Sequence, residues 1–316
     1  MTHTIAAGID ASQNYLDVGF APSGATFRVA NAAEGIAKLI ERLTKEGVRK
    51  VVLEAIGPYA QRLVQTLSLA DFEIGIVNPK RIKAFREAEG KRAKTDRLDA
   101  RLIARFALFM TDAIRPLPSP EQLALKSLSG RRRQLTELIA MEKVRLKQAI
   151  EPIVAQSHKR AIERLSEELK VIEAELGRRI ANDPELSKTL AILTSIPGIG
   201  TRIATLLVTD LPEIGNRDKK AIASLAGLAP HVSQSGNAPP RAAIAGGRPC
   251  VRAALYMGAL VAVRHNPELK KAYQAFRAQG KPAKVALIAI ARKLLVTANA
   301  RVKTKAPYVK NDAANT

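Results

Sequence analysis

The sequence of 316 residues predicts a mixed α/β domain at the N-terminus and mainly helical structure after it. Short β-rich runs separated by turn residues are confined to the first 80 residues, which indicates a single sheet. From residue 80 onward, apolar residues recur at helical spacing between glycine and proline stops. The apolar fraction is 47%, which excludes wholesale disorder. The predicted fold class is therefore α/β followed by α.

The order of elements in the first 80 residues predicts the kind of sheet. Strands are expected at 4–11, 15–21 and 26–30, and then a helix at 33–47. These are followed by a buried strand at 50–57, a helix at 59–70 and a strand at 72–79. A meander of three strands followed by helical crossovers is the ribonuclease-H-like order, because a doubly wound domain would alternate strands and helices from the start.

The remaining chain is predicted to be helical and to divide at composition boundaries. Residues 80–110 are basic and helical, and RPLPSPE (115–121) ends that region because proline breaks a helix. Residues 121–181 contain a heptad-like seam, formed by Ile162, Leu165, Leu169, Ile172, Leu176 and Ile180. A dimerising coiled coil and a seam packed within one chain both fit this spacing. We predict domains at 1–115, 116–185 and 186–303, with a disordered tail at 304–316.

The net charge of +22 indicates a polyanionic partner. The excess lies in two blocks, +10 over residues 80–150 and +14 over residues 191–316, which favours a nucleic-acid groove over two solvated faces. A single cysteine, Cys250, excludes a disulfide framework. The sequence has no signal peptide and no run of 18 apolar residues, so we expect a cytoplasmic protein with no membrane partner, associated with the nucleoid when it acts.

Four carboxylates predict a divalent-metal site. Asp10 ends the first strand and Glu54 ends the fourth, while Asp96 and Asp99 lie three residues apart on one face of a helix. The ends of those two strands are adjacent in a ribonuclease-H-like sheet. Clustered carboxylates repel one another and need a cation, and their hard oxygens suit Mg²⁺ or Mn²⁺. The alternative is that Asp96 and Asp99 are exposed helix acids paired with nearby arginines.

Two groups of residues are candidates for nucleic-acid contacts. The cations beside the aspartates are expected to hold substrate phosphates; they are Lys91, Arg92, Lys94, Arg97 and Arg101. The sequence PGIG between two helical runs resembles a helix-hairpin-helix, in which backbone N–H groups bind a phosphate. Its candidate contacts are Gly198, Gly200, Thr201 and Arg202. The alternative is a tight helix connector without a ligand.

Ser235 is a candidate nucleophile in a long loop predicted at residues 227–249. The glycine after it allows sharp presentation of the hydroxyl, and Arg241, Arg248 and Arg252 could orient a phosphate. Because Ser-Gly pairs are common in loops, these residues alone favour an ordinary loop.

The motifs of the whole chain resemble those of the DEDD transposases of the 110/1111 insertion-sequence family. The N-terminal half carries GID, EAIGPY, IVNPKRIKAF and AKTDRLDARLIARFA. The C-terminal half carries SIPGIG, SLAGLAP, SQSG, GGRPCVRAALYM and HNPELKKAYQAF. The last two segments resemble the 1111 subgroup.

The resemblance implies a RuvC-like domain in which Asp10, Glu54, Asp96 and Asp99 bind Mg²⁺, and a nucleophilic serine that maps onto Ser235. It further implies an RNA-guided recombinase whose noncoding bridge RNA pairs with donor and target DNA, working as a tetramer built from dimers. Two other functions are compatible with the residues. One is a metal-dependent Holliday-junction-type nuclease, and the other is a non-catalytic nucleic-acid-binding scaffold.

Overall fold

A computed structural model describes residues 5–54, 58–90, 95–109, 115–116, 118–233 and 241–309 of the chain. The chain divides into two compact units, residues 1–119 and residues 120–316. In the part of the chain that the structure describes, no helix is both long and apolar enough to cross a membrane.

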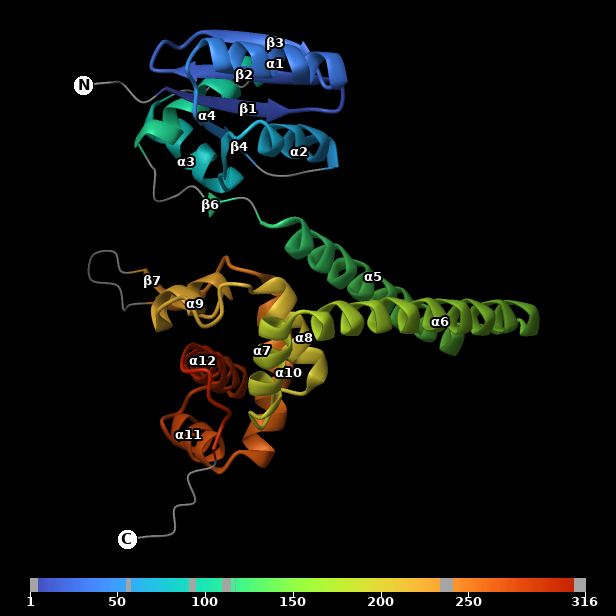
Figure 1. The fold of residues 1–316 in the computed structure, drawn as a ribbon. Helices are drawn as coiled ribbons and strands as arrows, with labels where there is room; N and C mark the ends of the chain where they lie inside the picture. The colour runs from blue at the N-terminus through green and yellow to red at the C-terminus, as the bar shows by residue number, and fades with distance from the viewer. Residues whose placement is uncertain are drawn as a thin grey trace. The chain divides into compact units, whose positions relative to one another are not determined.

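The first unit is built on a mixed sheet (Figure 1). Its strands lie in the order β3-β2-β1-β4-β5-β6. β2 pairs antiparallel with both β1 and β3, whereas β1, β4 and β5 are parallel. This is the ribonuclease-H-like order that the sequence predicts. The strands are β1 (Ala6–Ala11), β2 (Tyr15–Ala21), β3 (Thr26–Ala30), β4 (Lys50–Leu53), β5 (Glu73–Ile76) and β6 (Arg115–Pro116).

Helices cover both faces of this sheet. On one face, α1 (Ala33–Lys45) and α2 (Gln61–Leu69) bury their leucines against Ile9 and Val18. The short helix η1 (Pro58–Ala60) precedes α2. On the other face, α3 (Pro79–Ala88) and α4 (Asp96–Phe109) pack against Val52 and Val77. The sheet is thus the middle layer of three, and α3 and α4 share its second face.

Two glycines allow α4 to approach the second face closely. Gly8 of β1 and Gly19 of β2 pair with each other across the two strands. A Cβ on Gly8 would lie 2.2 Å from the backbone nitrogen of Ala104, and one on Gly19 would lie 2.6 Å from the Cα of Arg101. Any side chain at these positions would therefore push the helix outward. The close packing brings the first turn of α4 down to the ends of the strands.

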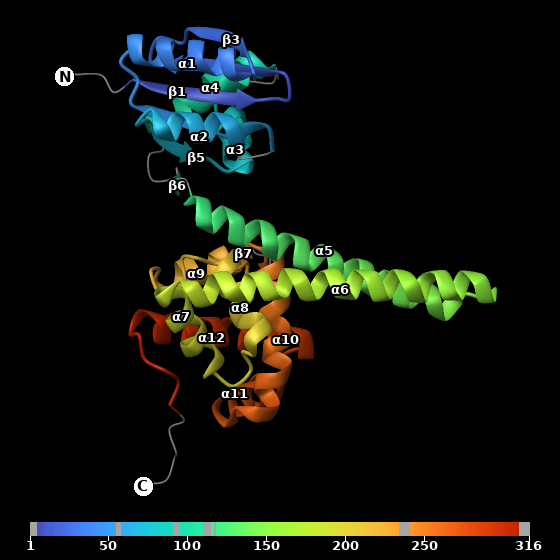
Figure 2. The ribbon, with the colours of Figure 1, turned by 45° about the vertical axis from the view of Figure 1, so that its right-hand side comes forward.

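The second unit is helical and begins with a long hairpin (Figure 2). α5 (Pro120–Gln148) and α6 (Pro152–Asn182) pack against each other within one chain. Of the predicted seam, Leu176 and Ile180 are buried, in a cluster with Leu125 of α5. The other helices surround a separate core; they are α7 (Pro184–Thr194), α8 (Thr201–Asp210), α9 (Lys219–Leu225), α10 (Pro249–His265), α11 (Pro267–Ala278) and α12 (Ala283–Lys303).

The structure differs from the sequence predictions at three places. The strand expected at 50–57 ends at Leu53. The loop expected at 227–249 contains an antiparallel pair, β7 (Pro230–Ser233) and β8 (Arg241–Ile244), whose strands of four residues are too short to show a clear alternating pattern. Residues 304–309 are not a disordered tail, because the backbone N–H of Tyr308 donates to Ser195 Oγ at 2.8 Å.

Candidate active site

Two carboxylates lie at the ends of neighbouring parallel strands. β1 and β4 pair in register up to Ile9 and Leu53, and Asp10 and Glu54 each follow by one residue. Side chains alternate between the two faces along a strand. Because Ile9 and Leu53 face α1 and α2, the next residues on both strands face α3 and α4. Strand pairing therefore brings together two acids that are 44 positions apart in the sequence.

The other two carboxylates come from the first turn of α4, which begins at Asp96. Asp96 is exposed, whereas Asp99 is only 4% exposed. All four predicted acids line one cavity of about 390 Å³, together with Pro79, Lys80, Ile82, Lys83 and Arg86 of α3. The structure thus brings the four carboxylates to one place.

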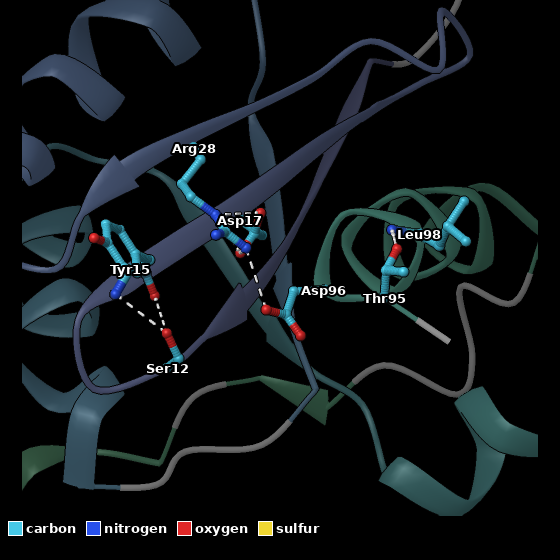
Figure 3. A network of polar contacts seen from close by, with 7 residues as sticks. All are labelled: Ser12, Tyr15, Asp17, Arg28, Thr95, Asp96 and Leu98. Atoms are coloured by element: carbon cyan, nitrogen blue, oxygen red, sulfur yellow. Dashed lines mark hydrogen bonds and ion pairs between the residues drawn. The ribbon is translucent and has the colours of Figure 1, made fainter. Parts of the chain in front are cut away.

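Both α4 carboxylates are paired with arginines. Arg86 donates to Asp99 at 2.5 Å in a partly buried ion pair. Arg28 of β3 binds Asp17 through two nitrogens, at 2.8 and 3.0 Å, and also donates to Asp96 at 3.2 Å. Figure 3 shows Arg28 lying between these two aspartates. Asp10, Asp17 and Arg28 form a row across β1, β2 and β3, because each pairs in register with the next.

The acids act electrostatically on one another. The pKa of Asp10 is raised from 3.8 to about 6. Partial burial of the carboxyl is the largest cause, and repulsion by Glu54, Asp99, Asp96 and Asp17 adds to it. Burial and the neighbouring carboxylates therefore both disfavour the charged form of Asp10.

The donor set fits a hard divalent cation. Its four members are carboxylates, the ligands that Mg²⁺ and Mn²⁺ prefer, and repulsion among them contributes to the raised pKa of Asp10. Within the described residues, however, no three His, Cys, Asp or Glu side chains converge closely enough to form a ready-made metal site. Two of the acids are turned toward Arg28 and Arg86, so a bound cation would have to share them or replace those arginines.

The predicted cations beside the aspartates have different surroundings. Lys91, Arg92 and Lys94 lie outside the described residues. Arg97 is exposed on α4. Arg101 donates to the carbonyl of Gly24, in the turn between β2 and β3, at 2.8 Å.

The PGIG sequence forms the turn between α7 and α8. Gly198 has a φ of +105°, and a Cβ there would lie 2.6 Å from the Cβ of Ala262 on α10, so packing between helices explains this glycine. Gly200 precedes α8 and has open space around its Cβ position. Thr201 begins α8, and Arg202 beside it is 78% exposed with Glu173 at 3.8 Å. The structure therefore leaves Gly200, Thr201 and Arg202 accessible.

Ser235 lies outside the described residues, between β7 and β8. Arg241 begins β8. Arg248 forms a bidentate ion pair with Glu213, at 2.6 and 2.7 Å. Arg252 donates to the carbonyl oxygens of Gly227 and Gly246, at 3.3 and 2.9 Å. Arg252 therefore links the chain before β7 to the chain after β8, whereas Arg248 is paired with Glu213.

Several residues at the cavity were not named individually as site residues from the sequence, although the cations of α3 belong to the basic block at 80–150. Lys80, Lys83 and Arg86 line it from α3, and the Asp17–Arg28 pair borders it from the sheet. A signal for the first group was present, because the Asn-Pro cap predicts a helix and the spacing of 3 puts its cations on one face. No comparable signal links Asp17 to Arg28.

Comparisons with known proteins identify the chain. Residues 7–154 match the profile of IS110-type DEDD transposases, and residues 190–274 match the profile described as the transposase IS116/IS110/IS902 family. The pilin gene-inverting protein of Moraxella lacunata is 30% identical over 264 residues, which is 82% of each chain. That of Moraxella bovis is 29% identical over the same length. An insertion element IS110 protein of Streptomyces coelicolor is 30% identical over 44% of this chain and 34% of its own.

A solved structure of T. thermophilus RuvC with a Holliday junction is 16% identical, covering 36% of this chain and all of its own with a TM-score of 0.30. The sequence matches define the class of protein, an enzyme of DNA recombination. The chain belongs to the IS110 family of transposases.

Proposed function

We propose that this protein is the transposase of an insertion sequence, a site-specific recombinase that cuts and rejoins DNA through a serine–phosphate intermediate. One observation carries the proposal: Asp10, Glu54, Asp96 and Asp99 line a single cavity in a chain of a transposase family. Clustered carboxylates repel one another, and a bound divalent cation that assists phosphodiester cleavage would offset that repulsion.

The four carboxylates hold Mg²⁺ or Mn²⁺ in this proposal. When bound, the cation neutralises phosphate charge and makes the phosphorus easier to attack. Ser235 supplies the nucleophile: its oxygen bonds to phosphorus and its proton passes to solvent. The phosphorus–O3′ bond breaks, and O3′ takes up a proton from solvent to leave a 3′-hydroxyl. After strand exchange, a 3′-hydroxyl attacks the phosphoserine and restores the serine. The reaction conserves bond energy and needs no ATP.

The finer features of the proposal rest on the resemblance to the 110/1111 family. A bridge RNA selects donor and target DNA by base pairing, which suits a protein with only 4% aromatic residues for stacking. The domains are 1–115, 116–185 and 186–303, with the second joining subunits through its coiled-coil-like helices in a tetramer. Gly200, Thr201 and Arg202 bind a backbone phosphate as part of a helix-hairpin-helix.

A denaturing gel with end-labelled DNA tests the serine intermediate. The full chain is incubated with Mg²⁺, the noncoding RNA encoded beside its gene and the DNA of the element's ends. We expect a protein–DNA adduct that disappears on proteinase treatment. Ser235→Ala should abolish both adduct and cleavage, while the matched control Ser233→Ala, two residues away on β7, should retain both.

Other outcomes favour the alternative functions. Cleavage that survives Ser235→Ala but requires Asp99 would indicate a Holliday-junction-type nuclease that uses water. Binding without cleavage by the wild-type chain with its RNA would indicate a nucleic-acid-binding scaffold.

A further inference from the structure

The cavity beside the carboxylates has two walls of opposite charge. One wall consists of the four acids on β1, β4 and α4. The other is the face of α3 that carries Lys80, Lys83 and Arg86, which we call the cationic wall. The sequence places these cations one helical turn apart, and the fold turns them toward the acids.

The cationic wall is held in position by the packing of α3. Asn78 caps the helix by accepting the N–H of Lys80 at 2.9 Å, and Pro79 occupies its first turn. Ile82 is 1% exposed in the core shared with α4, and Phe85 meets Phe106 of α4 edge-on at 5.4 Å. The helix therefore has a fixed rotation about its axis, so the direction in which its cations point follows from the fold.

The two lysines are the members of the wall most available to a ligand. Arg86 already forms an ion pair with buried Asp99, so it is less available to a ligand. Lys83 has Glu87 at 3.9 Å, but both side chains are largely exposed, and such surface pairs contribute little. Lys80 is exposed and lines the cavity. Arg81, its neighbour in the sequence, is equally exposed but does not line the cavity.

We propose that the cationic wall is the subsite for a backbone phosphate of the DNA strand that enters the carboxylate cavity, with Lys80 and Lys83 donating to its non-bridging oxygens. This inference rests on the proposed function. A cavity of about 390 Å³ with one acidic and one basic wall suits a bound cation and a phosphate side by side. Since phosphates carry no sequence information, this subsite positions the strand and leaves sequence choice to other contacts.

Lysine acetylation footprinting of the full-length chain tests the subsite directly. The protein is treated with an acetylating reagent with and without a DNA duplex of the element's end, using Ca²⁺ in place of Mg²⁺. We expect DNA to slow the acetylation of Lys80 and Lys83 several-fold. Lys38 and Lys45 on α1, which covers the other face of the sheet, should react at unchanged rates. Equal reactivity of all four lysines with and without DNA would overturn the proposal.

A binding measurement with matched variants gives a second, quantitative test. Lys80→Gln combined with Lys83→Gln should reduce the slope of log affinity against log salt by about 0.9, because the two lysines share one phosphate and each neutralised phosphate contributes about that amount. The control combines Arg81→Gln with Arg62→Gln. It removes two exposed positive charges that do not line the cavity. It should keep the wild-type slope. Equal slopes for the two double variants would contradict the subsite, and equal melting temperatures would rule out a folding defect.

Neither readout involves cleavage. The experiments can therefore contradict the phosphate subsite without contradicting the proposed serine–phosphate chemistry, and the reverse. Protection of Lys80 and Lys83 in a chain that does not cut DNA supports the subsite and contradicts the proposed chemistry. If the chain cleaves DNA but Lys80 and Lys83 are acetylated as fast with DNA as without it, the proposed chemistry is supported and the subsite is overturned.

Discussion

Asp99 in the first unit and Asp210 in the second are both buried aspartates paired with arginine, yet their surroundings differ. Asp210 accepts hydrogen bonds from Ser129 at 2.5 Å, Thr209 at 2.9 Å and Arg133 at 3.0 Å. Its partners therefore come from both α5 and α8. Asp99 has an ion pair with Arg86 and lines an open cavity with three further acids.

In the proposed function these two aspartates have different roles, structural for Asp210 and reactive for Asp99. A carboxylate that is fully hydrogen-bonded by side chains from two helices fastens those helices together. A carboxylate beside a cavity, with like charges around it, keeps lone pairs available to a ligand. Burial and an arginine partner are common to both, so neither property alone identifies an active site.

The largest expected effect is the loss of chemistry in Asp99→Asn. We expect DNA cutting to fall on the order of a thousandfold, about 4 kcal/mol in the barrier, because a neutral amide cannot hold a cation for phosphoryl transfer. The amide oxygen can still accept from Arg86, so the fold should persist. Single-turnover cleavage measures the effect. Glu41→Gln on the far face of the sheet serves as control, and an equal loss in both variants would contradict the assignment.

Asp210→Ala should instead reduce stability. Its removal leaves Ser129 and Arg133 without their buried partner and should lower the free energy of unfolding by about 3 kcal/mol. Urea denaturation followed by circular dichroism checks this value. The control is Glu137→Gln, at an exposed residue of α5, the helix that carries Ser129 and Arg133. This variant should have little effect on stability. A stable Asp210→Ala variant that has lost only cleavage would contradict the structural role of this residue.

Arg86→Gln should make the stability of the first unit depend on metal. Without the guanidinium, Asp99 is a poorly compensated charge, and the metal-free protein should lose about 2 kcal/mol of stability. Mg²⁺ should restore more of that loss than it adds to the wild type, because ligand binding to the folded state is linked to its stability. Melting temperatures in EDTA and in Mg²⁺ measure the difference.

The control for this prediction is Arg105→Gln. Arg105 pairs with Glu89 at 2.9 Å and does not line the cavity, so its response to Mg²⁺ should match that of the wild type. If Mg²⁺ raised the melting temperature of Arg86→Gln no more than that of this control, Arg86 would not be competing with metal for Asp99.

The smallest effect is a gain in stability for Asp10→Asn without metal. The pKa of Asp10 is about 6 in the folded chain against 3.8 for the free group, so ionising it opposes folding. That cost is absent below about pH 4, develops between pH 4 and 6 and is complete above pH 6. We expect the variant to be about 1 kcal/mol more stable at pH 7.5, since solvent screening of this partly exposed group reduces the full shift. Denaturation in EDTA at pH 4 and 7.5 tests the sign, and a difference that does not depend on pH would refute it.

Much of the first unit could be predicted from local signals. The strand pattern and its turn residues gave the sheet order, and position at strand ends identified Asp10 and Glu54. The seam in α6 could not be assigned a partner from its spacing alone, because the same apolar stripe suits α5 or a second chain. The β7–β8 pair was missed because its strands are short and stabilised by each other rather than by local propensity.

The sequence by itself determined which chemical groups the protein has and, in the first 80 residues, where most strands and helices begin. It places two acids at predicted strand ends and two at the start of a helix. It also contains an excess of positive charge in two blocks and the motifs of a transposase family. Only the tertiary structure decided which charges meet. Arg86 and Arg28 reach the α4 carboxylates, whereas Arg248 pairs with Glu213 and Arg252 donates to backbone carbonyls on either side of the β7–β8 hairpin. The physical reason is that ion pairing depends on distances of a few ångströms between residues far apart in the chain, which packing sets and local sequence does not.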